Sequence, residues 1–143
     1  MSADIAPLAP GRGRAPSRAE QLSVLIVDDV EDTRCLYQQY LEWQGLRVIA
    51  AADGVAGLQA VLWERPDVIV LDLAMPRMTG WEVMEGLKAD PRTSEIPVIV
   101  VSGQDCREQA IAKGADSYCA KPCLPDVLHR EIQRILREPA REL

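Results

Sequence analysis

The sequence has no apolar run long enough to cross a bilayer, which takes about 20 residues of helix. Its first twenty residues also lack the uninterrupted apolar segment of a secretory signal peptide, because prolines, glycines and arginines break them up. These two absences predict a cytoplasmic protein that inserts into no membrane.

Histidine and cysteine are also scarce, with one histidine (His129) and four cysteines in 143 residues. Cys119 and Cys123 have three residues between them, so they do not form the CxxC pair of thiol redox enzymes. Their spacing suits one half of a zinc site, but no second pair of ligands follows. The sequence therefore favours free thiols in a reducing compartment over a structural metal site.

An excess of positive charge and a glycine-rich phosphate loop are missing as well. The net charge is −6, and the first 22 residues hold three arginines against two acids, so the remainder is more acidic still. An acidic domain repels a phosphate backbone, which argues against direct nucleic-acid binding. Gly11-Arg-Gly13 precedes the first predicted strand and does not join a strand to a helix, so it is no phosphate loop.

The chain is long enough for one domain and too short for two ordinary ones. Residues 1–21 are rich in proline, glycine, arginine and alanine without periodicity, and we predict a disordered leader there. Residues 22–138 form the predicted domain, and residues 139–143 a short tail that leaves no room for an output module after Pro139.

Short apolar segments alternate with segments of helical periodicity over most of the domain. The predicted strands are Val24–Val27, Leu46–Ala51, Val68–Leu71, Val98–Val101 and Ala115–Cys119. The apolar residues with helical spacing are Leu36, Tyr40 and Leu41; Val55, Leu58 and Leu62; Val83, Met84 and Leu87; and Leu128, Ile132, Ile135 and Leu136. Ile111 belongs to a further predicted helix that ends at Gly114. This alternation predicts an α/β fold with a doubly wound, five-stranded parallel sheet and helices on both faces.

Residues that begin or end helices stand where this alternation requires them. Gly45 and Gly114 are predicted stops, and Asp53 is a predicted N-cap. Thr79 and Glu82 have the spacing of a capping box, and Pro125 suits the first turn of the last helix.

Polar residues follow four of the five strands. Asp28 and Asp29 follow the first strand, Asp72 the third, Ser102 the fourth and Lys121 the fifth. In an open parallel sheet, ligands bind beyond the carboxyl ends of the strands, where the strand order reverses. In the flavodoxin-like order 2-1-3-4-5 these four strands are consecutive and the second is at the edge. The sequence therefore predicts a single site.

The chemistry of this predicted site suits phosphoryl transfer. Three neighbouring carboxylates repel one another, and a divalent cation with oxygen ligands, such as Mg²⁺, relieves that repulsion. Asp72 can act as a nucleophile, and Lys121 can neutralise phosphoryl oxygens. Ser102 can donate its hydroxyl, and Gly103 leaves room for close approach. Each residue alone also suits a helix cap, a turn or an ordinary surface position.

Four ordered motifs in the chain resemble the response regulator receiver domain, of the single-domain chemotaxis-regulator type. They are Val24-Leu-Ile-Val-Asp28-Asp29, Val70-Leu-Asp72-Leu-Ala-Met-Pro76-Arg-Met-Thr-Gly80, Val101-Ser102-Gly103 and Ala120-Lys121-Pro122. The resemblance implies a two-component phosphoacceptor: Asp72 would take a phosphoryl group from a histidine kinase or phosphotransfer protein. It is not expected to be an enzyme beyond self-phosphorylation and self-dephosphorylation.

The resemblance also implies the role of each site residue. Mg²⁺ would be bound by Asp72, directly by Asp29, through water by Asp28 and by the backbone carbonyl of Ala74. Lys121 would contact the phosphoryl group together with Ser102 and Gly103, and the Lys121-Pro122 bond would be cis.

A switch follows from the same resemblance. Ser102 and Tyr118 would form the switch pair, in which the hydroxyl moves toward the phosphoryl group and the ring turns inward. The fourth helix, fifth strand and fifth helix would then present a changed surface to a downstream protein. Ala74 and Gln104 would tune the lifetime of the phosphorylated state. Gly57 is expected to interrupt the second helix, and Cys106, Cys119 and Cys123 to lie near the output surface as inert thiols.

Other functions compete with this interpretation. The same residues suit an intermediate of a phosphorelay, and the sequence leaves that choice open. An aspartyl phosphatase would need a second acid where Ala74 stands. A flavin-binding domain would need loops that cradle phosphate, and a receiver that works without phosphate would not need the full polar set.

Overall fold

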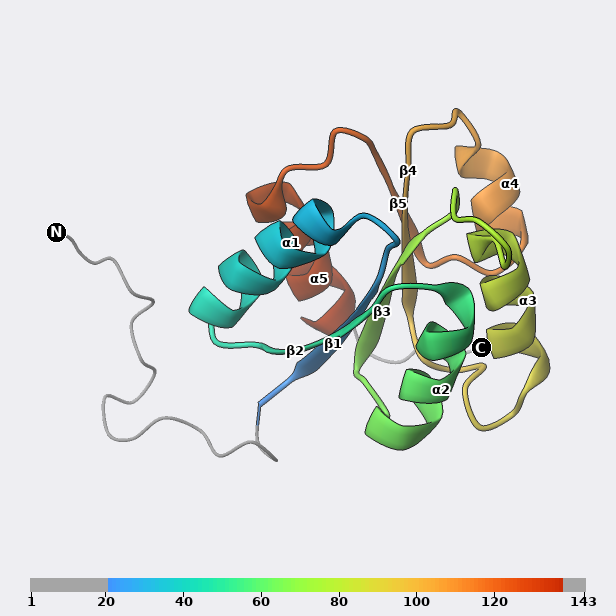
Figure 1. Cartoon of the computed structure of the whole chain (residues 1–143), viewed down its shortest axis with the longest axis horizontal. Helices are drawn as coiled ribbons and strands as arrows, with labels where there is room; N and C mark the ends of the chain where they lie inside the picture. The colour runs from blue at the N-terminus through green and yellow to red at the C-terminus, as the bar shows by residue number, and fades with distance from the viewer. Residues whose placement is uncertain (1–20, 138–143) are drawn as a thin grey trace, which may run out of the picture.

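The computed structural model describes residues 21–137 and places a parallel sheet between two helical layers (Figure 1). The elements are β1 (Ser23–Val27), α1 (Glu31–Trp43), β2 (Arg47–Ala51), α2 (Gly54–Glu64), β3 (Val68–Asp72), α3 (Gly80–Ala89), β4 (Val98–Ser102), α4 (Arg107–Ala112), β5 (Ser117–Ala120) and α5 (Pro125–Arg137). The sheet order is β2-β1-β3-β4-β5, with every pair parallel. The predicted α/β fold and strand order are therefore confirmed.

The predicted leader, apart from Gln21, and the predicted tail lie outside the described residues. Each strand bound differs from its prediction by no more than two residues at either end. Within residues 21–137, no helix is both long and apolar enough to cross a membrane.

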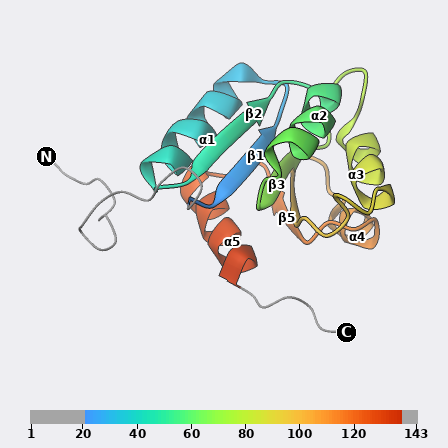
Figure 2. The same cartoon turned by 90° about the horizontal axis from the view of Figure 1, so that it is seen from below.

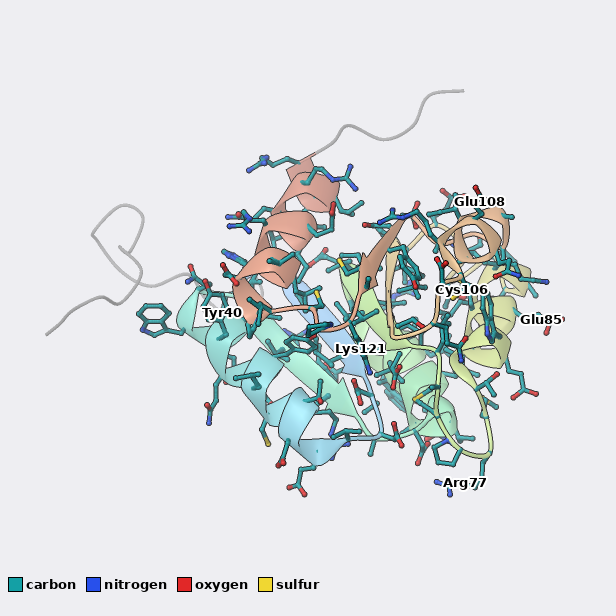
Figure 3. The ribbon with its side chains drawn as sticks, turned by 90° about the horizontal axis from the view of Figure 1, so that it is seen from above. Tyr40, Arg77, Glu85, Cys106, Glu108 and Lys121 are labelled. Atoms are coloured by element: carbon teal, nitrogen blue, oxygen red, sulfur yellow. The ribbon has the colours of Figure 1, made fainter. Side chains whose placement is uncertain are left out.

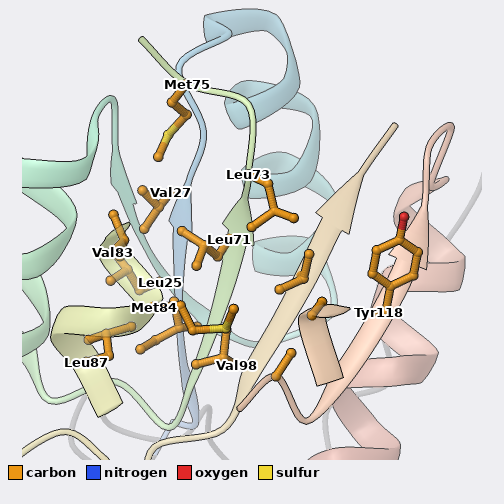
Figure 4. Close-up of a cluster of buried hydrophobic side chains, with 14 of the residues drawn as sticks. Leu25, Val27, Leu71, Leu73, Met75, Val83, Met84, Leu87, Val98 and Tyr118 are labelled. Atoms are coloured by element: carbon orange, nitrogen blue, oxygen red, sulfur yellow. The ribbon is translucent and has the colours of Figure 1, made fainter. Parts of the chain in front are cut away.

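Helices α1 and α5 cover one face of the sheet, and α2, α3 and α4 cover the other (Figures 1 and 2). Successive strand residues point to opposite faces, so Leu25 and Val27 join one buried cluster and Val24 and Ile26 the other. Figure 4 shows part of the cluster beneath α2, α3 and α4. Burial on both faces is the reason that the strands are apolar without alternation.

Two helices carry an apolar residue outside the face that packs on the sheet. In α1 the buried residues are Tyr37 and Leu41, whereas Leu36 is 52% exposed. In α4 the buried residue is Ala110, and Ile111 is exposed. Leu36 and Ile111 lie on helices, as predicted, but beside the buried stripe and not in it.

Helix α2 buries mainly small residues, and two of the three apolar residues that predicted it are exposed. Val55 and Leu62 are exposed, and the buried positions are Gly54, Gly57 and Val61. A β-carbon on Gly57 would lie 3.0 Å from the methyl groups of Val27, so glycine allows the helix to approach β1 closely. Gly57 therefore lies within a continuous helix, and the predicted interruption is wrong.

The predicted helix ends are confirmed. Gly45 has a φ of 97°, which ends the turn after α1, and the Asp53 carboxylate accepts the Ala56 N–H at 2.8 Å. Thr79 and Glu82 form the reciprocal capping box of α3, and α5 begins at Pro125. The helix starts at Asp53, Thr79 and Pro125 mark where three loops at the carboxyl edge of the sheet end.

Candidate functional site

Four neighbouring strands deliver the predicted polar residues to one edge of the sheet. Asp72 is the last residue of β3 and Ser102 the last residue of β4. Asp28 directly follows β1 and Lys121 directly follows β5. Figure 3 looks onto this edge and shows Lys121 near the centre of it. The strand-end pattern therefore predicted the right grouping.

Three carboxylates lie together at this edge. One oxygen each from Asp28, Asp29 and Asp72 lies within 4.8 Å of the others. Asp28 and Asp72 are each 3% exposed, whereas Asp29 is on the surface. An all-oxygen set that opens to solvent on one side suits Mg²⁺, which keeps several of its waters.

Burial is the main influence on the pKa values of Asp28 and Asp72. It raises the pKa of Asp28, and the Val30 N–H, which donates to Asp28 Oδ1 at 2.9 Å, partly offsets that rise. Burial likewise raises the pKa of Asp72, and the nearby Lys121 ammonium acts in the opposite direction. The charges of Asp72 and Asp29 add to the rise at Asp28, and the charge of Asp29 adds to the rise in the pKa of Asp72, so a bound cation would stabilise the charged forms of Asp28 and Asp72.

Lys121 lies beside the Asp72 carboxylate. Its Nζ is 3.4 Å from Asp72 Oδ1, and its side chain is 34% exposed. The Lys121 backbone N–H donates to the Ser102 carbonyl at 2.9 Å, and the Lys121-Pro122 peptide is cis, as predicted. A long, half-solvated ion pair is weak, so the ammonium can turn to another anion at little cost.

The loop after Asp72 folds back over the strand end. The Ala74 N–H donates to Asp72 Oδ1 at 3.3 Å, and the Gly80 N–H donates to the Leu73 carbonyl at 3.0 Å. A β-carbon on Gly80 would overlap the Asp72 carbonyl oxygen, so the start of α3 lies against the backbone of the central acid. Gly103 has open space around its Cα.

Ser102 and Tyr118 are connected through the loop that follows β4. The Gln104 N–H donates to Ser102 Oγ at 3.0 Å, and the Tyr118 hydroxyl donates to the Gln104 carbonyl. The Cys106 thiol lies 4.0 Å from Ser102 Oγ and 3.9 Å from the Tyr118 hydroxyl. Tyr118 is buried in this structure, and the Arg107 guanidinium lies 5.1 Å from the centre of its ring.

Sequence reasoning missed the contacts of Cys106 and Arg107 with this pair. It also missed Arg34, which donates to the Asp28 carbonyl at 2.8 Å, and Tyr37, which donates to the Cys123 carbonyl. No spacing motif marks these residues, because Arg34 and Tyr37 donate to backbone carbonyls, which every residue possesses. Cys106 and Arg107 contact Tyr118, which lies on a different element. All four cysteines are free thiols.

Known proteins match this chain over most of the described residues. A family model described as the response regulator receiver domain matches residues 24–133. The transcriptional regulatory protein AfsQ1 of Streptomyces coelicolor is 34% identical over 123 residues, which cover 84% of this chain and 53% of AfsQ1. The response regulator PleD of Caulobacter vibrioides is 33% identical over 117 residues, covering 80% of this chain and 26% of PleD.

Solved structures are similar over the same region. The chemotaxis response regulator CheY4 of Vibrio cholerae matches with a TM-score of 0.75 at 30% identity, covering 80% of this chain and 98% of that one. A CheY-like receiver domain protein of Methanospirillum hungatei matches with a TM-score of 0.74 at 30% identity, covering 82% and 94%. The chain spans about half the length, or less, of the curated relatives it matches.

Proposed function

The chain belongs to the response regulator receiver family, and on that premise we propose that Asp72 accepts a phosphoryl group from the phosphohistidine of a kinase or phosphotransfer protein. One observation carries the proposal: the buried Asp72 carboxylate has two acids within 4.8 Å and the Lys121 ammonium at 3.4 Å. The proposed nucleophile, the carboxylates proposed to hold a cation and the Lys121 ammonium thus lie together at one edge of the sheet.

In the proposed reaction an oxygen of Asp72 attacks phosphorus, the phosphorus–nitrogen bond of the donor breaks, and the donor imidazole leaves with the bond's electron pair. Asp28, Asp29 and Asp72 would hold Mg²⁺, together with the Ala74 carbonyl, and the ion would neutralise charge on the phosphoryl oxygens. Lys121 exchanges its contact with Asp72 for a phosphoryl oxygen. Ser102 and Gly103 receive another oxygen from the β4 side.

The proposed output is a change in the surface formed by α4, β5 and α5. In the proposed switch Ser102 Oγ moves toward the phosphoryl group and changes its contact with the Gln104 N–H, while the Gln104 carbonyl accepts the Tyr118 hydroxyl. Movement of Ser102 would therefore shift Gln104 and with it the hydrogen bond of Tyr118. A downstream cytoplasmic protein would bind the altered surface. Onward transfer to a second histidine, as in a phosphorelay, would use the same residues.

Acetyl phosphate tests the proposal without a kinase. Incubation with acetyl phosphate and Mg²⁺ should add the mass of one phosphoryl group to the intact protein. The gain should disappear in Asp72→Ala and persist in Asp32→Ala, a matched change at an exposed acid of α1. A folded wild-type protein that gains no mass with Mg²⁺ present would contradict the proposal.

A further inference from the structure

Tyr37 makes a buried hydrogen bond that has no part in the phosphorylation proposed above. Its hydroxyl donates to the Cys123 carbonyl at 2.7 Å, between residues 86 positions apart in the chain. Both residues are buried in the cluster beneath α1 and α5. A buried carbonyl that loses its donor is costly, so this contact holds the Cys123 backbone in place.

Cys123 lies in the loop between β5 and α5, two residues after Lys121. The loop is fixed at its start, where the Lys121 N–H donates to Ser102, and at its end, where the Leu128 N–H donates to the Leu124 carbonyl. Lys121, Pro122 and Leu124 are exposed, so packing of their side chains restrains the loop little. The bond from Tyr37 ties the middle of the loop to a helix.

The same helix also contacts the acidic side of the site. Arg34 Nη1 donates to the Asp28 carbonyl at 2.8 Å. Residues three apart lie on one side of a helix, so Arg34 and Tyr37 reach the two loops from neighbouring turns. Helix α1 thereby joins the backbone that carries the acid pair to the backbone that carries the lysine.

We propose that Tyr37 is a positioning residue that sets the place of the Lys121 ammonium relative to Asp72. The Lys121 ammonium can turn between anions, and the place of the loop backbone sets the region that it can reach. Small displacements of a charged group from the reacting atoms slow a reaction strongly. The inference rests on the proposed phosphorylation of Asp72.

Tyr37→Phe removes the hydroxyl and keeps the ring. Phosphorylation by acetyl phosphate at saturating Mg²⁺ should slow roughly twofold to tenfold, the factor that corresponds to one net hydrogen bond. Mg²⁺ affinity should stay unchanged, because the three acids keep their places. Tyr40→Phe is the matched control: it removes a hydroxyl from the same helix, where the ring packs near Trp43 and His129, and should leave the rate unchanged.

A double-mutant cycle separates positioning from general loosening. In a Lys121→Met background, Tyr37→Phe should slow phosphorylation no further, because the group that it positions is gone. An equal slowing in both backgrounds would overturn the inference, and so would a Tyr37→Phe rate equal to wild type.

Amine labelling supplies a readout that does not depend on phosphorylation. Tyr37→Phe should increase acylation of Lys121 by an N-hydroxysuccinimide ester about twofold or more relative to Lys113, and Tyr40→Phe should not. A wild-type protein that resists acetyl phosphate would refute the proposed function alone, and the labelling would still decide on Tyr37. Unchanged Lys121 labelling in Tyr37→Phe would refute the positioning role.

Discussion

At the residue scale, Asp72 is buried, but two groups beside it are open to solvent. The Asp72 carboxylate is almost fully buried, yet its partners Asp29 and Lys121 reach solvent. Burial alone would favour a protonated acid, while the lysine and a cation in the acidic cluster favour the carboxylate that a nucleophile requires. The backbone around Asp72 must therefore keep the carboxylates of Asp72 and Asp29 and the ammonium of Lys121 within a few ångströms of one another.

Gly80 tests how tightly that backbone is packed. In Gly80→Ala the new β-carbon would overlap the Asp72 carbonyl oxygen and lie 2.6 Å from Leu73 Cα, and backbone atoms cannot rotate away. We expect a loss of about 1–3 kcal/mol in the free energy of unfolding, measured with urea. Gly103→Ala, after the neighbouring strand, has open space and should change that free energy by less than about 0.5 kcal/mol. Equal losses would contradict this account.

At the element scale, α1 and α5 share one face of the sheet and meet through aromatic contacts. The Tyr40 ring of α1 lies 6.0 Å from the His129 ring of α5, edge to face. Burial lowers the pKa of His129 below its ordinary value of 6.5. The neutral imidazole is thus the form that this helix contact favours.

The lowered pKa of His129 makes the folded protein less stable as the pH falls. The unfolded chain takes up a proton on His129 near pH 6.5, before the folded chain does, so acidification favours unfolding. The stabilising contribution is present above pH 6.5 and is lost as the pH falls through the lowered pKa of the folded state.

The urea midpoint of wild type should therefore fall more between pH 7.5 and pH 5.5 than that of His129→Gln. Asp28 and Asp72 act in the opposite direction, because their raised pKa values favour protonation in the folded state. They are present in both proteins and cancel in the comparison. Identical pH dependence in the two proteins would show that His129 does not contribute.

At the scale of the whole molecule, the acidic edge joins four strands and opposes folding by charge repulsion. Chain segments that begin near residues 28, 72 and 121 converge there. A cation that binds only the folded arrangement stabilises the entire domain, since the three acids are far apart in the unfolded chain.

Mg²⁺ should therefore raise the free energy of unfolding, by about 2.7 kcal/mol at a concentration one hundred times the dissociation constant. The gain should be lost in Asp29→Asn, which changes an exposed ligand, and retained in Asp32→Asn. Urea unfolding at constant ionic strength, with NaCl replacing MgCl₂, measures it. A gain of equal size in wild type and Asp29→Asn would point to a non-specific salt effect.

The sequence by itself determined the sheet, its order and the residues at its carboxyl edge. Apolar runs of strand length can be buried only between two layers, and chain direction then places Asp28, Asp72, Ser102 and Lys121 at one edge. Helix caps such as Asp53 could be predicted from the sequence because the side chain bonds a backbone group only three residues away.

Tertiary structure decided the rest. Leu36 and Tyr37 are adjacent and both apolar in character, and only the packing of α1 on the sheet selects Tyr37 for burial. The bond from Tyr37 to the Cys123 carbonyl joins backbone and side chain across 86 positions. Local periodicity cannot predict such a contact, because the acceptor is a backbone carbonyl, which every residue possesses. The distance between the Tyr37 hydroxyl and that carbonyl is set by how α1 and α5 pack on the sheet.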